Sequence, residues 1–282
     1  MIYVVEPGPL ATVQDLGRPG WAHLGVGRSG AADLTAHRLA NRLLGNAEGA
    51  ATLELTLGGL RLRAENGVTI AVTGADSPLW VDGREQALNA PLRLPAGAEL
   101  VVGVPARGLR GYFAVRGGVS VEPVLGSRST DLLSGLGPAR LSAGDRLPVG
   151  RDVVGDPVVD QAPVAAWADE PVLRVLPGPR RERFDDRAWP ALLATTWTTS
   201  PDSNRIAARL SGPPLAPRMD RELPSEPLVP GAVQVPISAQ PLIFLADHPV
   251  TGGYPVLAVV VEADLSAAAQ LRPGQRVRFR PA

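Results

Sequence analysis

Glycine and proline set the layout of this sequence. Its 282 residues contain 31 glycines and 29 prolines, which divide most of the chain into short apolar runs. Both residues interrupt helices and mark turns, and short apolar runs between turns are typical of strands in barrels or sandwiches. The sequence therefore predicts a mainly β protein. The runs expected to form strands include Ile2–Val5, Leu53–Leu57, Val68–Thr73, Leu100–Val104, Tyr112–Val115, Leu173–Leu176, Leu242–Leu245, Leu257–Val261 and Arg276–Phe279.

One segment near the N-terminus has the pattern of a longer helix, from residue 30 to residue 44. Its alanines and leucines recur at helical spacing, Ser29 precedes it as an expected N-cap, and Gly45 follows its end. The pattern places His37 on the solvated flank of this helix. Shorter helical turns are expected near Trp189–Ala194 and Leu265–Leu271.

A stretch rich in proline, aspartate, alanine and glycine, with no clear period, interrupts the β pattern after residue 149. Such composition is typical of a linker or of a segment that crosses between domains. We therefore expect an N-terminal β-barrel domain over residues 1–150, a linker or crossing segment over residues 151–171, and a C-terminal β-barrel domain over residues 172–282.

Composition excludes several classes of function. The formal net charge is zero, so no nucleic-acid partner is expected. No apolar run approaches the roughly 18 residues that cross a membrane, and the first residues have no signal-peptide profile, which predicts a cytoplasmic protein. Cysteine is absent, which excludes disulfides and cysteine nucleophiles. Lysine is absent too, so this chain has no Walker A lysine, no Schiff base for pyridoxal phosphate and no covalent biotin.

The run GVGRSG, residues 25–30, has the glycine spacing of a dinucleotide-binding fingerprint. That fingerprint must directly follow a strand, whereas the preceding residues, GRPGWAHL, are typical of a loop. The alternative is an anion site, in which backbone N–H groups at the start of the helix act together with the Arg28 guanidinium. A tight turn with a surface arginine and a serine cap remains the structural alternative. The candidate residues of this run are Gly27, Arg28, Ser29 and Gly30.

Three further loops concentrate polar side chains, which either form sites or bond their own backbone in turns. The first carries Gln14, Asp15 and Arg18, the second carries Ser127, Arg128, Ser129 and Asp131, and the third carries Asp202 and Asn204. The three histidines show no ligand spacing, so no protein-built metal site is expected. No G-x-S-x-G run stands between a strand and a helix, which argues against a serine hydrolase.

Seven segments occur together in a collinear order. They are TVQDLGRPGWAHLGVGRSGAAD (12–33), LELTLGG (53–59), VTGAD (72–76), FAVRGGV (113–119), VLGSRSTDL (124–132), SEPLVPGAVQVP (225–236) and DHPVTGGYPVLAVV (247–260). In this set the chain resembles the allophanate hydrolase subunit 2 family, also described as the KipA or biotin-dependent carboxyltransferase-like family. The resemblance extends from Tyr3 to Phe279.

The resemblance implies two cyclophilin-like β-barrel domains and a KipI-like partner subunit. In a 5-oxoprolinase of this family, the two proteins work with a third, LamB-like subunit to open the lactam of 5-oxoproline to glutamate at the expense of ATP. ATP with Mg²⁺ is thus the implied cofactor, and the implied substrate is a small amide or lactam. Alternatives within the family are allophanate hydrolysis, carboxyl transfer from biotin to urea, and a KipA-like regulatory role in which the chain binds a KipI-like kinase inhibitor.

In the lactam-opening interpretation, arginines and loop N–H groups supply the charge stabilisation that phosphoryl transfer needs. The resemblance then assigns catalytic roles to four residues and binding roles to the others, with Asp15, Asp33 or Asp131 available to hold Mg²⁺ or to orient a nucleophile. The catalytic candidates are Asp15, Arg28, Arg128 and Asp131. The substrate- or phosphate-binding candidates are Gln14, Arg18, Gly27, Ser29, Gly30, Ser127, Ser129, Asp202, Asn204, Gly253 and Tyr254.

Overall fold

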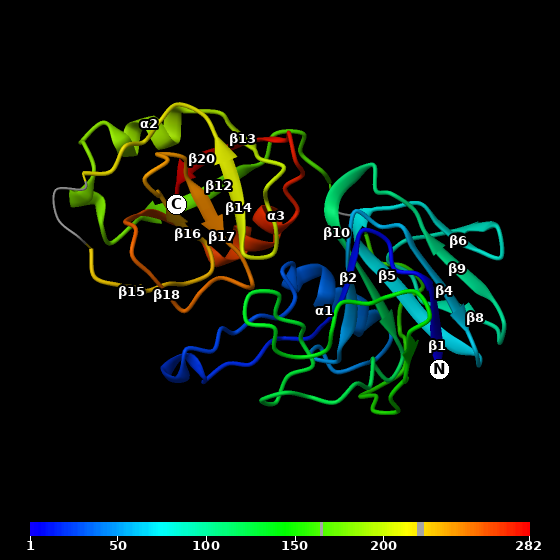
Figure 1. Cartoon of the computed structure of the whole chain (residues 1–282). Coiled ribbons are helices and arrows are strands. Elements are labelled where there is room, and N and C mark those ends of the chain that lie inside the picture. Colours follow the sequence, from blue (N-terminus) through cyan, green and yellow to red (C-terminus); the bar gives the residue numbers. More distant parts are fainter. Residues whose placement is uncertain (164–165, 219–222) are drawn as a thin grey trace. The chain divides into compact units, whose positions relative to one another are not determined.

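A computed structural model describes residues 1–163, 166–218 and 223–282 (Figure 1). Contacts divide the chain into two compact units. The N-terminal unit consists of Met1–Arg18, Ser29–Asp131 and Gly135–Trp167, and the C-terminal unit consists of Pro19–Arg28, Leu132–Ser134 and Ala168–Ala282. The predicted domain bounds and crossing segment stay a prediction, and residues 164–165 of that segment lie outside the described residues. Among the described residues, no helix has the length and apolar character needed to span a membrane.

The C-terminal unit contains a closed β-barrel. The strand order around it is β12-β19-β16-β17-β14-β13-β20, and β12 pairs with β20 in parallel whereas the other neighbours are antiparallel. The strands are β12 (Val172–Pro177), β13 (Trp197–Thr199), β14 (Ala207–Ser211), β16 (Ala232–Gln234), β17 (Leu242–Phe244), β19 (Val256–Val260) and β20 (Arg276–Pro281).

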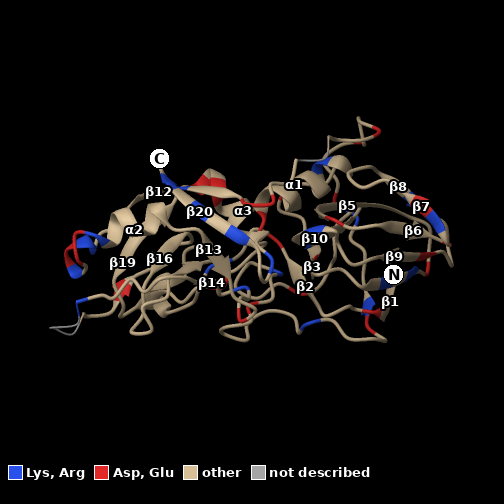
Figure 2. Cartoon of the chain, turned by 90° about the horizontal axis from the view of Figure 1, so that it is seen from above, with Lys and Arg blue, Asp and Glu red and all other residues tan. Residues whose placement is uncertain are grey.

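Alternation along the last strand shows how the barrel separates its core from solvent. In β20, Val277 and Phe279 are buried, whereas Arg276, Arg278 and Arg280 are exposed, and Figure 2 shows these basic positions along the strand. Successive side chains of a strand point to opposite faces, so this run lines the core on one side only. The unit also contains a two-stranded sheet and several short helices. These are β15 (Glu226–Pro227), β18 (Thr251–Gly252), α2 (Ala188–Ala194), α3 (Leu265–Ala269), η1 (Ala22–Leu24), η2 (Arg181–Arg183) and η3 (Glu262–Asp264).

The N-terminal unit contains two antiparallel sheets. The six-stranded sheet has the order β11-β1-β4-β9-β6-β7, and the five-stranded sheet has the order β2-β3-β10-β5-β8. The first comprises β1 (Ile2–Glu6), β4 (Leu60–Ala64), β6 (Leu79–Val81), β7 (Arg84–Gln86), β9 (Glu99–Val102) and β11 (Arg146–Leu147). The second comprises β2 (Leu10–Gln14), β3 (Thr52–Thr56), β5 (Val68–Asp76), β8 (Leu92–Leu94) and β10 (Arg107–Val115).

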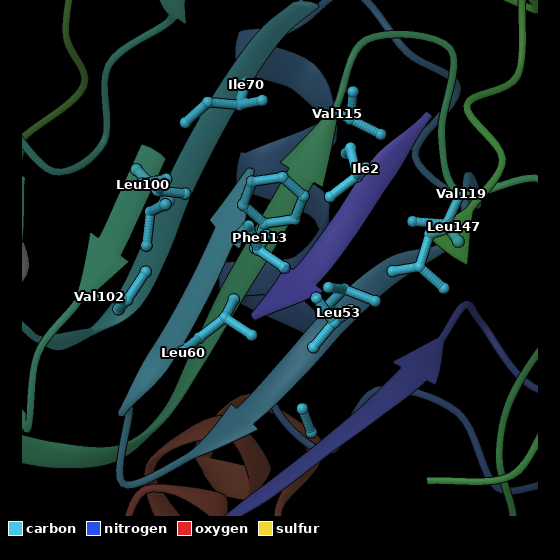
Figure 3. Close-up of a cluster of buried hydrophobic side chains, with 14 of the residues drawn as sticks. Ile2, Leu53, Leu60, Ile70, Leu100, Val102, Phe113, Val115, Val119 and Leu147 are labelled. Carbon is cyan, nitrogen blue, oxygen red and sulfur yellow. The ribbon is translucent and has the colours of Figure 1, made fainter. Parts of the chain in front are cut away.

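Side chains from both sheets of the N-terminal unit form one hydrophobic core, part of which is drawn in Figure 3. Ile2 and Leu60 come from the six-stranded sheet, and Leu53 and Phe113 come from the five-stranded sheet. Burying a side chain of this size contributes about 1.5–3 kcal/mol relative to leaving it exposed. The mainly β fold class is thus confirmed.

The helix α1 (Leu34–Leu43) covers the other face of the five-stranded sheet. Its buried residues, including Ala40 and Leu43, share a cluster with Ala71 and Tyr112 of the sheet. The helix begins four residues later than the predicted start, because Asp33 is its N-cap and accepts a hydrogen bond from the N–H of Ala36 at 3.0 Å. The expected Ser29 cap is wrong: Ser29 has a φ of 53° and lies outside the helix. The two shorter helical turns are confirmed as α2 and α3.

Candidate functional site

The buried carboxylate of Asp15 joins two of the loops that the sequence singled out. Asp15 directly follows β2, and its Oδ1 accepts hydrogen bonds from Ser127 Oγ at 2.6 Å, Ser129 Oγ at 2.5 Å and the N–H of Gly17 at 2.8 Å. Its Oδ2 accepts from the N–H of Arg128 at 2.6 Å. Charge-assisted bonds of this kind are shorter and stronger than neutral ones. The Asp15 network therefore fixes the loop after β2 against residues 127–129.

Two candidate arginines also bind this network, through backbone carbonyls. Arg18 is 1% exposed; its Nη2 donates to the carbonyl of Ser129, and its Nε donates to the carbonyl of Val124 at 3.4 Å. The Nε of Arg128 donates to the carbonyl of Val121 at 2.7 Å. Part of each guanidinium thus holds the loop in place. The remaining guanidinium N–H groups are the donors with which each arginine can bind a ligand.

Three buried polar atoms beside the Asp15 network have no hydrogen-bond partner among the described residues. They are the Oε1 of Gln14, the Nη1 of Arg18 and the Oγ1 of Thr130. The Nε2 of Gln14 donates to the carbonyl of Thr130 at 2.9 Å, and Arg18 contacts the preceding carbonyl, that of Ser129. Buried polar groups are almost always paired with protein or water. An acceptor, a cationic donor and a hydroxyl in one neighbourhood are therefore able to bind a water molecule or a polar ligand group.

The glycine-rich run reaches the Asp15 network at its C-terminal end. Ser29 Oγ donates to the carbonyl of Thr130 at 3.2 Å, and the N–H of Ala31 donates to the carbonyl of Asp15 at 2.9 Å. Gly30 has a φ of 98°, and a Cβ there would lie 2.8 Å from the backbone nitrogen of Gly17. Only glycine permits this approach of the two backbone segments.

The predicted helix-terminus anion site is wrong in one respect. Because α1 begins at Leu34, the N–H groups of its first turn lie beyond the glycine-rich run. The N–H groups of Ala31, Ala32 and Asp33 instead donate within the protein, to Asp15 O, Glu54 Oε2 and Tyr112 Oη. These three amides are already used and are therefore not available to an anion.

The remaining predicted residues are divided between the two units. Asp131 is buried in the N-terminal unit, where its N–H donates to the carbonyl of Leu136 at 2.9 Å. The other predicted residues are assigned to the C-terminal unit. They are Gly27, Arg28, Asp202, Asn204, Gly253 and Tyr254.

Two of these candidates belong to an ordinary turn. The Oδ1 of Asn204 accepts from the N–H of Ile206 at 2.8 Å and from that of Ala207 at 3.2 Å. Asp202 is exposed, and its N–H donates to Ser200 Oγ at 3.2 Å. Asparagine and serine side chains commonly bond nearby backbone in this way. The amide of Asn204 is therefore engaged in forming the start of β14.

A second buried polar cluster, centred on Glu54, was not predicted from the sequence. The Oε2 of Glu54 accepts from Tyr112 Oη at 2.7 Å and from the N–H of Ala32 at 2.8 Å, and Arg110 Nε lies 3.5 Å from its Oε1. Tyr112 Oη in turn accepts from the N–H of Asp33 at 2.7 Å. Burial, followed by the nearby Glu54 charge, raises the pKa of Tyr112 well above its usual value. The sequence contains one indication of this buried cluster, because Glu54 stands between two leucines in the run LELT.

His37 faces the sheet, so its predicted solvation is wrong. The side chain is fully buried, with Nδ1 2.9 Å from Thr52 Oγ1 and Nε2 3.5 Å from Asn41 Nδ2. Burial lowers its pKa from 6.5 to about 4, against the opposing effects of the Asp15 and Glu54 charges. The imidazole is therefore neutral at pH 7. The sequence did not predict this burial because His37 stands between Ala36 and Arg38, a position that also fits an exposed helix flank.

Residues 24–281 match the family described as carboxyltransferase domain, subdomain A and B. The chain belongs to this family. Over 99% of its length it is 39% identical to the C-subunit of 5-oxoprolinase from Escherichia coli strain K12, and the match covers 90% of that protein. The carboxyltransferase-domain family and the 5-oxoprolinase relationship that the sequence motifs predicted are thus confirmed.

Solved structures of longer proteins contain a domain like this chain. The structure of TTHA0988 matches it with a TM-score of 0.88 at 36% identity, covering 99% of this chain and 55% of the other. The Kluyveromyces lactis urea carboxylase matches with a TM-score of 0.92 at 30% identity, covering 99% of this chain and 27% of the other. This carboxyltransferase domain thus spans about half the length of the first protein and a smaller share of the second.

The acidic residues of the domain offer only a limited fit to Mg²⁺. The described residues contain no group of three or more aspartate, glutamate, histidine or cysteine side chains placed to hold a metal. The Oδ1 of Asp15 already accepts three hydrogen bonds, and the Oδ1 of Asp33 caps α1. Mg²⁺ usually binds through one or two carboxylates together with substrate phosphates and water. Within residues 1–163, 166–218 and 223–282, the carboxylates therefore fit a metal whose other ligands come from a bound nucleotide.

Proposed function

We propose that this chain is part of an ATP-dependent amide hydrolase that opens 5-oxoproline to glutamate, in a complex with KipI-like and LamB-like subunits. The observation that carries the proposal is the 39% identity to the C-subunit of 5-oxoprolinase, which extends over 99% of this chain and 90% of that protein. A similarity of that length covers both units of the fold and is not limited to one motif.

The chemistry requires activation of a poor electrophile. Transfer of the terminal phosphoryl group of ATP to the lactam oxygen gives an activated imidate and ADP. Water then attacks the ring carbon and the ring C–N bond breaks, which frees the amine and leaves an acyl phosphate. A second water hydrolyses the acyl phosphate and phosphate leaves, so that 5-oxoproline, ATP and two waters give glutamate, ADP and phosphate. Positioning and charge stabilisation provide most of the catalysis in phosphoryl transfer.

The unpartnered atoms beside Asp15 suit recognition of an amide. The Nη1 of Arg18 is a cationic donor for the substrate carbonyl or for phosphate, and the Oε1 of Gln14 is an acceptor for the lactam N–H. The Asp15 carboxylate holds Ser127, Ser129 and the backbone of Arg128 in place, so its role in this proposal is to position the loops. Arg128 supplies further positive charge in the N-terminal unit, and Arg28 is the catalytic candidate of the C-terminal unit.

A second function within the family is carboxyl transfer to urea or a related amide. The similarity to the Kluyveromyces lactis urea carboxylase favours it, with a TM-score of 0.92. Because none of these 282 residues is lysine, none of them can carry a covalent biotin. A KipA-like role, in which the chain binds and antagonises a KipI-like kinase inhibitor, is the non-catalytic alternative.

The decisive experiment reconstitutes the complex. The chain is purified with its KipI-like and LamB-like neighbours, and ADP release is followed with and without 5-oxoproline while each protein is omitted in turn. We expect ADP release that requires both 5-oxoproline and this chain. A stable complex without such release would contradict the proposal, and stimulation by urea instead would favour the carboxyl-transfer function.

Variants connect the activity to the arginines. Arg28→Ala and Arg128→Ala are expected to abolish turnover without loss of partner binding, whereas Arg84→Ala, a change on the exposed strand β7, is the matched control and keeps full activity. Full activity in either test variant would remove that arginine from the site.

A further inference from the structure

The C-terminal unit contains a cleft that the Asp15 network does not include. Its volume is about 340 Å³, and it is lined by residues of η2, by residues before and within α2, and by Arg218 and β19. Small-molecule sites occupy about 300–1,000 Å³, so this cleft suits a compact ligand. Figure 2 shows basic and acidic segments side by side next to α2.

The cleft has an apolar floor and a cationic wall. Phe184 and Leu257 are buried and line the cleft beside the indole of Trp189. The Arg181 guanidinium lies over the Trp189 ring, 5.1 Å from its centroid. A cation stacked on an aromatic face in this way is attracted to the ring and held in orientation. With Arg218, the cleft therefore presents two guanidinium groups, which recognise carboxylates well.

Three carboxylates complete the lining, and two of them have partners nearby. Glu182 Oε1 lies 3.6 Å from Arg180 Nη1, and Asp185 Oδ1 accepts from the N–H of Arg187 at 2.8 Å. Asp186 also lines the cleft. The cleft thus combines both signs of charge around an apolar floor.

We infer that this cleft binds a free α-amino acid that carries a second carboxylate, with glutamate as the simplest probe. The two guanidiniums match two carboxylates, the acidic side chains match the α-ammonium group, and the methylene groups lie on the Phe184 and Leu257 surface. A nucleoside triphosphate would place its phosphates against three carboxylates, and a lactam has no ammonium group to pair with them. The site goes beyond the proposed reaction and stands whether or not glutamate is its product.

The test measures binding to the full chain by titration calorimetry and by tryptophan fluorescence, without ATP or partner subunits. We expect L-glutamate to bind and to change the Trp189 emission. Glutarate, which has no ammonium group, and 4-aminobutyrate, which has no α-carboxylate, are each expected to bind about tenfold or more weakly, because each loses a charge-assisted contact.

Variants assign the binding to the cleft. Arg218→Gln and Asp186→Asn are expected to weaken glutamate binding about tenfold or more, and Trp189→Phe is expected to remove the fluorescence change. Arg187→Gln alters an exposed arginine outside the lining and leaves binding unchanged. Absence of binding at millimolar glutamate, equal binding of glutarate, or unchanged binding in Arg218→Gln would each overturn the assignment. Because no turnover is measured, these outcomes are independent of the lactam-hydrolase proposal.

Discussion

Replacing Asp15 with alanine tests whether its carboxylate holds the loops of the N-terminal unit together. In the native protein this carboxylate accepts four hydrogen bonds, from Gly17, Ser127, Ser129 and Arg128. Asp15→Ala removes every acceptor at once and places no new atom where the oxygens were. We therefore expect a loss of stability in the N-terminal unit that a typical surface substitution does not produce.

The size of the stability loss in Asp15→Ala depends on which of the four donors can bond to another acceptor. The hydroxyl of Ser129 keeps a role as acceptor from the N–H of Asp15, at 3.0 Å, and a hydroxyl rotates. The N–H groups of Gly17 and Arg128 are fixed in the backbone and would lose their partners. A fully buried donor left without a partner costs about 1–3 kcal/mol, and these two donors are partly buried, so Asp15→Ala is expected to cost about 2–4 kcal/mol. Against a typical total of about 5–15 kcal/mol, this is a large fraction.

Native-state hydrogen exchange is the suitable assay, because it reports opening free energies for separate regions of a chain with two units. The amides of β10 report on the N-terminal unit, and those of Gly17 and Arg128 report on the loops directly. The control is Asp145→Ala, which removes a single exposed hydrogen bond to the N–H of Ser142 and is expected to cost about 0.5–1.5 kcal/mol. If Asp15→Ala costs no more than Asp145→Ala, the carboxylate does not hold the loops and the positioning role is refuted.

Three further predictions concern buried groups. Tyr112→Phe removes the hydroxyl that bridges the N–H of Asp33 and Glu54, and is expected to destabilise the N-terminal unit by about 1–3 kcal/mol, measured by hydrogen exchange at Asp33. Because folding lowers the pKa of His37 from 6.5 to about 4, its contribution to stability is complete above pH 6.5 and is lost as pH falls toward 4, by about 3 kcal/mol. Urea titrations across this range should show that slope in the wild type and a smaller one in His37→Gln. Arg205→Met breaks the fully buried ion pair with Asp247 and is expected to cost about 3–5 kcal/mol in thermal unfolding, with part recovered on adding Asp247→Leu.

Local signals in the sequence were sufficient to predict that the fold is mainly β. Turn residues between short apolar runs predicted strands such as β1, β5 and β10, because glycine and proline act on the backbone within a few residues of themselves. The existence of α1 was also predictable from its period, whereas its start was not. Ser29 and Asp33 are both acceptable caps by residue type, and the choice between them depends on the contacts that hold Ser29 outside the helix.

The composition of the Asp15 network was only partly predictable. Asp15, Ser127 and Ser129 were all candidates, because each lies in a loop where several polar residues occur together. That one carboxylate binds two hydroxyls more than 100 residues away depends on tertiary structure. Glu54 was missed for the opposite reason: it lies within a strand, where alternation favours a solvated side chain. Glu54 is buried beneath the segment that precedes α1, where it bonds to the N–H of Ala32 and to Tyr112.

The two buried polar clusters meet at the segment that joins the glycine-rich run to α1. Three consecutive amides, those of residues 31, 32 and 33, donate to Asp15 O, Glu54 Oε2 and Tyr112 Oη. A segment held by three different acceptors has little freedom to rearrange around a ligand. The same bonds occupy three backbone N–H groups that a phosphate would otherwise use. Arg28→Ala and Arg128→Ala change side chains and leave these three backbone bonds in place, so they are the informative changes for activity.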